Sequence, residues 1–227
     1  MLRIIFTQSP IIRDTCVASL SLGRNPTEAS ADFIVYQKWD WILIFSKEFD
    51  IDVTLPTILD NWDPDRIYLP HLGRSVDMMH EIGDVILPNV FIPYASQKDT
   101  DTDTDTDTDT NEITGISEAR FLEIYNEQKD YYVEDYGLSV GGIVVEKVPN
   151  DPELNTDLMM TYEADIYLTE SLDAAYAVTS GDLVPALIIC GIVEGKASKN
   201  ESGTPEQMAI RNMLTTIRLT EDNGGME

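Results

Sequence analysis

Short apolar runs, each bounded by charged or turn-forming residues, recur along the chain. Runs of about four to eight residues that are rich in β-branched and aromatic side chains are typical of β-strands. The pattern predicts strands at residues 3–6, 39–45, 85–91, 143–148, 165–168 and 186–193. Their spacing is too irregular for a repeated strand-helix-strand unit, so the strand pattern favours a mixed arrangement over a regular parallel sheet.

Three internal segments show helical signals. Residues 54–61 predict a short helix that tolerates Pro56 only in its first turn, because proline lacks a backbone N–H. Residues 75–82 predict a second helix, with Ser75 as its N-cap. Residues 117–132 place apolar side chains among acids at the spacing of an amphipathic helix.

The C-terminal helix carries the best signals. Thr204-Pro205-Glu206-Gln207 supplies an N-cap, a proline at the first helical position and a capping box. Apolar residues follow at helical spacing, at positions 208, 213, 214 and 217. The predicted fold class is therefore α+β.

A simple repeat interrupts the chain at residues 99–110, where six Asp-Thr dipeptides follow one another. Alternating carboxylates repel one another and bury nothing, so residues 98–112 are predicted to be a disordered acidic linker. The pattern resembles the start of a calcium loop, but the glycine and the terminal glutamate of such a loop are missing. The linker separates a first region, residues 1–97, from a more acidic α+β remainder, residues 113–227.

The charge of the chain is extreme. Asp and Glu number 41 against 15 Lys and Arg, which gives a net charge of -26 at pH 7. Such a surface repels nucleic acids and anionic lipids in ordinary salt. Two explanations stay open: an acidic protein that binds a basic or metallic partner, or a halophilic cytoplasm in which acidic surfaces are the rule.

The two cysteines and the apolar runs bear on location. Cys16 and Cys190 match no zinc or redox spacing, and we expect both to be buried small hydrophobes in a reducing compartment. Residues 1–12 lack the features of a signal peptide. The longest apolar run, residues 183–193, is about half of what a membrane span needs. We therefore expect a cytoplasmic protein without a membrane partner.

Catalytic chemistry is hard to find in the sequence. Only two histidines exist, His71 and His80, and no nucleophile-base pair, phosphate loop or dinucleotide motif can be assembled around them. We predict no catalytic residues, no metal ligands and no cofactor. The sequence leaves the question of catalysis open and leans toward a protein that is not an enzyme.

One segment, residues 66–75, combines several residues suited to binding an anion. Pro70 stiffens an extended approach, and Gly73 permits a tight turn or a close backbone contact. Arg74 and Ser75 then stand at the predicted start of a helix, whose free amides favour a negative charge. A guanidinium at that position can hold a phosphate in a bidentate manner.

Two ring side chains of the same segment are also suited to binding a nucleic acid. Tyr68 and His71 are able to stack on nucleic acid bases. The alternative is a structural turn in which Arg74 pairs with Asp77 or with another nearby acid.

The stretch Tyr-Leu-Pro-His-Leu-Gly-Arg-Ser at residues 68–75 resembles the "YLGRSED"-like motif of the Cas-five family. Members of this family are the RAMP subunits that cap the five-prime handle of the guide RNA in type I CRISPR effector complexes. Residues 33–60 also resemble the strand, charged turn and short helix that lead into the motif, so the resemblance covers roughly residues 30–95. The family has a longer region ahead of the motif, which implies that this chain is truncated at its N-terminus.

The resemblance implies a ferredoxin-like, RNA-recognition-type antiparallel sheet with helices, and residues 1–97 would form part of it. It further implies a non-catalytic subunit of an antiviral Cascade complex. Its partners would be guide RNA and other RAMP subunits, without a small-molecule substrate. The residues expected to contact RNA are Tyr68, His71, Gly73, Arg74 and Ser75.

Two other functions stay open beside this one. The first is a halophilic, acidic cytoplasmic interaction domain of unrelated function, in which the Leu-Gly-Arg turn is purely structural. The second is an acidic metal- or cation-binding protein that uses the Asp-Thr repeat.

Overall fold

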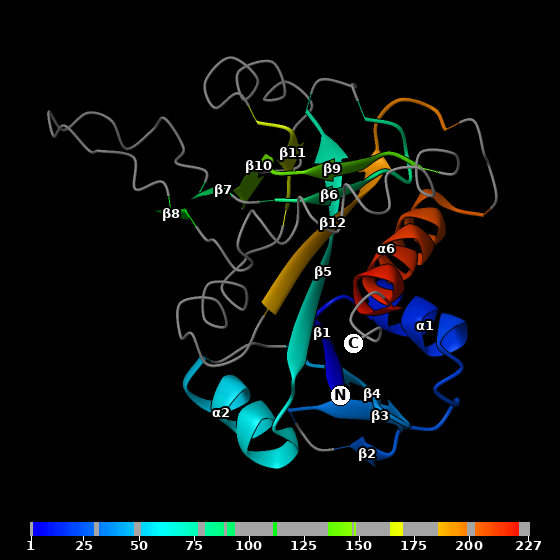
Figure 1. The fold of residues 1–227 in the computed structure, drawn as a ribbon, viewed down its shortest axis with the longest axis vertical. Helices are drawn as coiled ribbons and strands as arrows, with labels where there is room; N and C mark the ends of the chain where they lie inside the picture. Colours follow the sequence, from blue (N-terminus) through cyan, green and yellow to red (C-terminus); the bar gives the residue numbers. More distant parts are fainter. Residues whose placement is uncertain are drawn as a thin grey trace, which may run out of the picture.

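Two long parallel strands, β5 (Arg66–Ser75) and β12 (Ala186–Glu194), run through the middle of the molecule in the computed structural model (Figure 1). They belong to a mixed twelve-stranded sheet that is curved rather than flat. The structure describes residues 2–29, 32–47, 51–76, 80–88, 90–93, 111–112, 136–146, 148, 164–169, 186–198 and 203–222.

The N-terminal part of the sheet is built around parallel strands. Strand β1 (Arg3–Thr7) lies between β4 (Trp41–Phe45) and β5, and is parallel to both. Strand β3 (Ile34–Lys38) returns antiparallel beside β4, and the short β2 (Glu28–Ala29) forms the edge. Strands β1 and β4 are nearly continuous apolar runs because both faces of a parallel sheet are covered.

The second part of the sheet attaches to the far ends of β5 and β12. Strand β11 (Ile166–Tyr167) pairs antiparallel with the end of β5, and β10 (Ile143–Glu146) is parallel to β11. The remaining strands are β6 (Val85–Leu87), β7 (Val90–Pro93), β8 (Asn111–Glu112) and β9 (Leu138–Val140). Strand β7 is parallel to β10, β8 pairs with β7, and β6 joins β12 to β9.

Helices cover both faces of the sheet. Helices α1 (Pro10–Ser19) and α6 (Pro205–Asp222) lie side by side over one face, and α2 (Ile51–Trp62) covers the other (Figure 1). The core under α1 and α6 includes Ile12, Cys16 and Met213, all nearly inaccessible to solvent. Two packed layers of helix thus exclude water from the strands and supply the main apolar burial of the fold.

The start of α6 confirms the predicted capping box. The Thr204 hydroxyl accepts a hydrogen bond from the Gln207 N–H at 3.3 Å, and the Gln207 side-chain oxygen accepts one from the Thr204 N–H at 3.4 Å. Two backbone donors at the helix start are satisfied reciprocally. Local sequence signals are therefore enough to place this helix.

The predicted ferredoxin-like antiparallel sheet is wrong. Strands β4, β1, β5 and β12 form a parallel core, and α1 and α2 follow strands of that core in the sequence. This arrangement is a mixed α/β fold. Irregular strand spacing hid it because short antiparallel strands are inserted between the parallel ones.

The helix predicted at residues 75–82 is also wrong. Ser75 is the last residue of β5, and residues 80–83 form a bridge and a turn. The parallel partner β12 continues to pair as far as Arg74, so strand pairing overrides the local capping signal. Two predicted strands also differ from the structure. The strand predicted at residues 39–45 begins only at Trp41, after a hairpin turn, and the strand predicted at residues 85–91 is interrupted between β6 and β7.

Two further differences concern helices. Helix α2 starts at Ile51, so Pro56 lies inside the helix rather than in its first turn. Helix α1 was not predicted, although Pro10 stands at its first turn, where proline is favoured. The predicted helix at residues 117–132 and the Asp-Thr repeat at residues 99–110 lie outside the described residues. Asn111 and Glu112, the last two residues of the predicted linker, form β8.

The predicted burial of the two cysteines is confirmed, since Cys16 and Cys190 are both inaccessible to solvent and neither forms a disulfide. Burial raises the pKa of the Cys16 thiol to about 12, which keeps it protonated. None of the helices in the described part of the chain is long and apolar enough to cross a membrane.

Gly73 is expected to be indispensable for close packing between β5 and β11. A Cβ atom at this position would overlap Cγ2 of Ile166 and meet Cδ2 of Leu168 at 3.0 Å. We expect Gly73→Ala to lower the free energy of unfolding by about 1–3 kcal/mol, the usual cost of overpacking a core. Chemical denaturation monitored by tryptophan fluorescence measures the change.

A double-mutant cycle with Ile166→Ala provides the control. Removing Cγ2 of Ile166 makes room for the new methyl group, so the double variant should be less destabilised than the sum of the two single variants. Strictly additive effects would show that the two positions do not clash.

Candidate active site

The carboxyl ends of β5 and β12 bring three polar side chains together. Arg74 stands opposite Glu194 in the parallel β5–β12 pairing and opposite Tyr167 in the antiparallel β5–β11 pairing. A register shift between Ile192 and Glu194 places Glu194, rather than its neighbour, at this point. We call Arg74, Tyr167 and Glu194 the strand-end cluster. In open α/β sheets, ligands bind outside the carboxyl ends of the strands, so this cluster is the candidate site.

An ion pair and a ring contact hold the cluster. Nε of Arg74 lies 3.1 Å from Oε2 of Glu194, and Cζ of Arg74 lies 6.0 Å from the centroid of the Tyr167 ring. The side chains of Arg74 and Glu194 are 26% and 60% exposed, whereas Tyr167 is 2% exposed. The buried ring therefore forms a floor beneath a cation that still reaches solvent.

Two glycines fix the backbone on either side of the ion pair. Gly73 precedes Arg74 and has no space for a side chain against β11. Gly195 follows Glu194, and a Cβ atom there would come within 2.5 Å of the His80 carbonyl oxygen. Close packing at both neighbours limits how far Arg74 and Glu194 can move, and this holds the two charged groups in position.

A second pair of titratable groups lies beside the cluster. Oδ1 of Asp165 is 3.9 Å from Nε2 of His80, and Oδ2 of Asp165 accepts a hydrogen bond from the Ile143 N–H at 2.8 Å. The carbonyl oxygen of Asp165 accepts a hydrogen bond from the N–H of Val76, just beyond the end of β5. The pair is thus anchored directly to the strand that carries Arg74.

The pKa of Asp165 lies below its ordinary value. The imidazole of His80 is the main cause, and the Ile143 N–H adds to the effect. Partial burial opposes both influences because it disfavours the charged carboxylate. Asp165 is therefore ionised in the folded protein at neutral pH.

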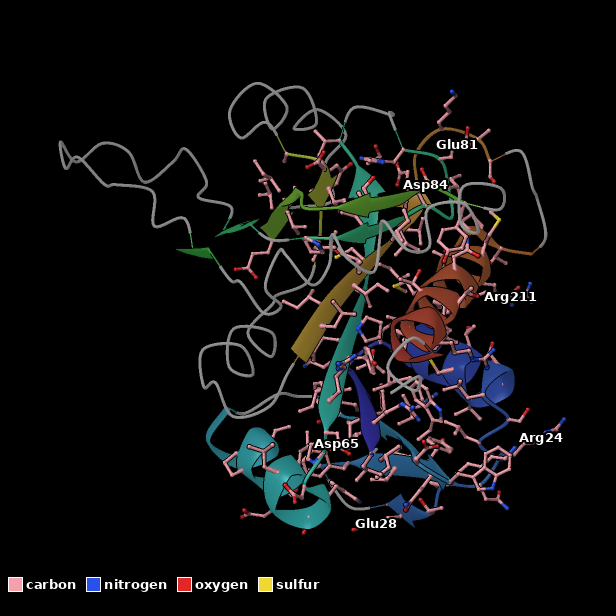
Figure 2. All side chains as sticks on the ribbon, in the orientation of Figure 1. Arg24, Glu28, Asp65, Glu81, Asp84 and Arg211 are labelled. Atoms are coloured by element: carbon pink, nitrogen blue, oxygen red, sulfur yellow. The ribbon has the colours of Figure 1, made fainter. Side chains whose placement is uncertain are left out.

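The loop that carries His80 is tied to the end of β12. The N–H of Lys196 donates to the His80 carbonyl at 2.9 Å, and the N–H of His80 donates to the Ser75 hydroxyl at 3.4 Å. Asp84 closes the same loop by accepting hydrogen bonds from the N–H groups of Glu81 and Gly137. Figure 2 shows Glu81 and Asp84 at one end of the molecule and Glu28 at the other.

The residues predicted to contact RNA lie along β5 and do not converge. Tyr68 is fully buried and its ring stacks on Trp41, with centroids 6.2 Å apart. His71 is half-buried opposite Cys190, Gly73 is enclosed, and Ser75 is buried. Arg74 is the member with a side chain in the strand-end cluster, and it lies in a strand rather than at a helix start. RNA contact by these residues stays a prediction.

Sequence reasoning missed Tyr167, Glu194 and Asp165, and treated His80 as a bystander. A signal for Glu194 exists, because it is the charged residue that ends the strongest apolar run. Its meaning depends on β12 being parallel to β5, which the sequence pattern did not reveal. No group of three or more His, Cys, Asp or Glu side chains within the described ranges is arranged to hold a metal ion.

No family model and no curated protein matches the chain. Solved structures do match. The 5'-methylthioadenosine/S-adenosylhomocysteine nucleosidase of Helicobacter pylori, crystallised with butyl-thio-DADMe-Immucillin-A, is 15% identical with a TM-score of 0.64, over 96% of this chain and 98% of that one. The native futalosine hydrolase of the same organism is 14% identical with a TM-score of 0.66, over 98% of each chain. The Neisseria meningitidis nucleosidase in complex with methylthio-immucillin-A is 13% identical with a TM-score of 0.66, again over 98% of each chain. At these identities the likeness establishes the fold.

These neighbours overturn the Cas-five resemblance. The chain has the fold of the nucleosidases over nearly its whole length, not that of a RAMP subunit. The expected role in a CRISPR complex, the guide RNA and Cascade partners, and the absence of a small-molecule substrate are therefore wrong. The alternative of an acidic interaction domain of unrelated function is also unsupported. Because the neighbours are enzymes by description, they count against the lean toward a non-catalytic protein.

The ionised Asp165 predicts a pH-dependent contribution to stability. Its pKa is lowered from 3.8 in the folded state, so the contribution is complete above the unfolded value and is lost as the pH falls through the folded value. Asp165→Asn removes the charge facing His80 but keeps an oxygen for the Ile143 N–H. We expect this variant to be less stable than the wild type at pH 7, and the gap to close below about pH 3.8.

Denaturation curves measured across this pH range test the expectation. Glu28→Gln, which removes an exposed carboxylate from the edge strand β2, supplies the background effect of losing one negative charge. A gap that stays constant with pH would mean that the charge of Asp165 does not contribute to stability.

Proposed function

We propose that the chain binds a purine nucleoside at the strand-end cluster and hydrolyses its N-glycosidic bond. The observation that carries this proposal is the fold match over 96% to 98% of this chain with nucleosidases and a futalosine hydrolase. The position of Glu194 at the carboxyl end of a parallel strand supports it, since ligands of such sheets bind there.

Hydrolysis of this bond involves two proton transfers. Water adds to C1' of the sugar and loses one proton to the solvent, while the bond from C1' to the base nitrogen breaks and the electron pair of that bond goes to the base. The leaving base must take up a proton, and a positioned acid accelerates this step. A carboxyl group suits the role because in its protonated form it donates one hydrogen bond while its other oxygen accepts one.

Glu194 is the carboxylate best placed for this task. Its Oε2 atom faces Arg74, and its Oε1 atom has no hydrogen bond or ion pair with another described residue. A purine with an amino group at C6 presents an acceptor at N7 beside that amino donor. A protonated Glu194 is complementary to this edge, since it can donate to N7 and accept from the amino group.

The neighbouring residues position Glu194. Arg74 holds one carboxylate oxygen, and the buried Tyr167 ring supports the guanidinium from below. The close packing at Gly195 keeps the end of β12 against the His80 loop. Groups held in this way lose little freedom when a ligand binds, which favours catalysis.

We also propose a cytoplasmic location for this activity. The support is that neither of the two buried cysteines forms a disulfide, since disulfides are rare in reducing compartments.

Glu194→Gln should abolish most of the proposed activity. The amide cannot supply a proton but keeps the size and polarity of the side chain, so we expect kcat/KM to fall by about 10²- to 10⁴-fold, the usual contribution of a general acid. The measurement is release of free adenine from 5'-methylthioadenosine and from adenosine, followed by liquid chromatography. Because the net charge of -26 makes compactness depend on ionic screening, assays at low and at molar potassium chloride are both needed.

Glu28→Gln is the matched control, because it makes the same chemical change at an exposed position of the edge strand β2, away from the strand-end cluster, and should leave the rate unchanged. The proposal fails if wild-type protein that is folded by circular dichroism releases no base from either nucleoside at either salt concentration. A Glu194→Gln variant with unchanged kcat/KM would instead remove Glu194 from the catalytic residues.

A further inference from the structure

The guanidinium of Arg74 has more hydrogen-bonding capacity than the cluster uses. Its Nε group faces Glu194, and its plane contacts the Tyr167 ring. Neither Nη group has a hydrogen-bond or ion-pair partner in the part of the chain that the structure describes. An arginine carries five N–H donors in a planar fork, and the two terminal groups match the two oxygens of a carboxylate or phosphate.

The surroundings of Arg74 favour an incoming oxyanion over a mobile surface cation. The side chain is 26% exposed, so it reaches solvent while being held by neighbours on several sides. Tyr167 below it and Gly73 beside it keep its backbone and its ring contact fixed. A fork that is already oriented loses little rotamer freedom when it binds, and planar guanidinium groups are suited to bidentate recognition.

The negative charge of the chain makes Arg74 important for binding an anion. The net charge of -26 repels anions from the surface in general. An anionic ligand therefore needs a local cation that is close enough to form direct hydrogen bonds. Arg74 offers such a cation at the carboxyl ends of the central strands, next to the carboxylate proposed to act on the base.

We infer that Arg74 forms an oxyanion subsite, so that the cluster favours a nucleoside accompanied by a phosphate or carboxylate group. The oxyanion is either a substituent of the nucleoside itself or a separate inorganic phosphate bound beside an uncharged nucleoside. This inference rests on the proposed function, because it takes the nucleoside to bind at the same cluster. It adds a determinant of substrate class to a site whose catalytic group is Glu194.

Glu194 and the oxyanion compete for the same guanidinium. The ion pair at 3.1 Å leaves Arg74 partly neutralised, and an arriving anion meets the carboxylate of Glu194 beside it. Replacing Glu194 with glutamine removes this repulsion. The two residues should therefore have opposite effects on oxyanion binding, which separates a specific subsite from general weakening of the site.

Isothermal titration calorimetry tests the inference with adenosine, adenosine 5'-monophosphate, and adenosine in the presence of inorganic phosphate. The wild type should bind the monophosphate roughly 10- to 100-fold more tightly than adenosine, the range expected for charge-assisted hydrogen bonds. If the oxyanion is a separate ion, adenosine should gain the same advantage when inorganic phosphate is added. Arg74→Gln should abolish the advantage in either arm, and Glu194→Gln should increase it.

Arg66→Gln is the matched control, because it removes the same charge from the opposite end of the same strand. It should leave the ratio of the two affinities unchanged. Thermal unfolding of each variant establishes that it is folded before binding is measured.

The outcomes separate this inference from the proposed function. Equal affinity for adenosine with and without an oxyanion in the wild type, or an advantage that survives Arg74→Gln, overturns the subsite and leaves nucleoside binding intact. Binding of the monophosphate that depends on Arg74, without release of any base, keeps the subsite and contradicts hydrolysis. Failure of folded wild-type protein to bind any of these ligands overturns both.

Discussion

The parallel pairing of β5 with β12 is the constraint on which the rest of the structure depends. The register runs without interruption from Ile67 opposite Ala186 to Gly73 opposite Ile192, and then shifts so that Arg74 meets Glu194. Apolar side chains of this ladder alternate between the two core clusters: Ile67, Leu69 and Ile188 belong to the cluster that includes Ile58 of α2, and Tyr68, Leu187 and Ile189 belong to the cluster under α1 and α6. The shift at the end of the ladder then brings two opposite charges together where the apolar core stops. The fold and the candidate site are thus consequences of one register.

The same pairing explains which parts of the fold could be predicted from the sequence. Strand β12 and the capped helix α6 follow from local signals, and both begin where the sequence pattern predicts. Residues 75–82 show the limit of such signals. Ser75 is a good N-cap in isolation, yet it ends a strand because β12, more than a hundred residues later, supplies backbone partners up to Arg74. Pro70 is tolerated in this strand because the neighbouring β1 stops pairing at Tyr68.

Of the strand-end cluster, the sequence pointed to Arg74 alone, for the same reason. Arg74 was singled out because the sequence predicted it at the start of a helix, directly after Gly73, where a guanidinium can hold a phosphate. Its partners Tyr167 and Glu194 lie about a hundred residues away, and no local pattern connects them to it. The resemblance of residues 68–75 to a short motif then pointed to the Cas-five family, which is wrong. Leu-Gly-Arg-Ser reads as a turn when it stands alone, whereas the β5 pairing shows that its glycine is required by the side chains of β11.

The ion pair with Arg74 distinguishes Glu194 from the many other acidic side chains of the chain. In a chain of net charge -26, most acidic side chains face water and carry no information about a ligand. Glu194 differs because a guanidinium is held beside it by a buried ring and by two closely packed glycines. An oxyanion bound as we propose would share the guanidinium of Arg74 with Glu194. In the function and the subsite that we propose, recognition of an oxyanion by Arg74 and proton donation by Glu194 both depend on this one ion pair.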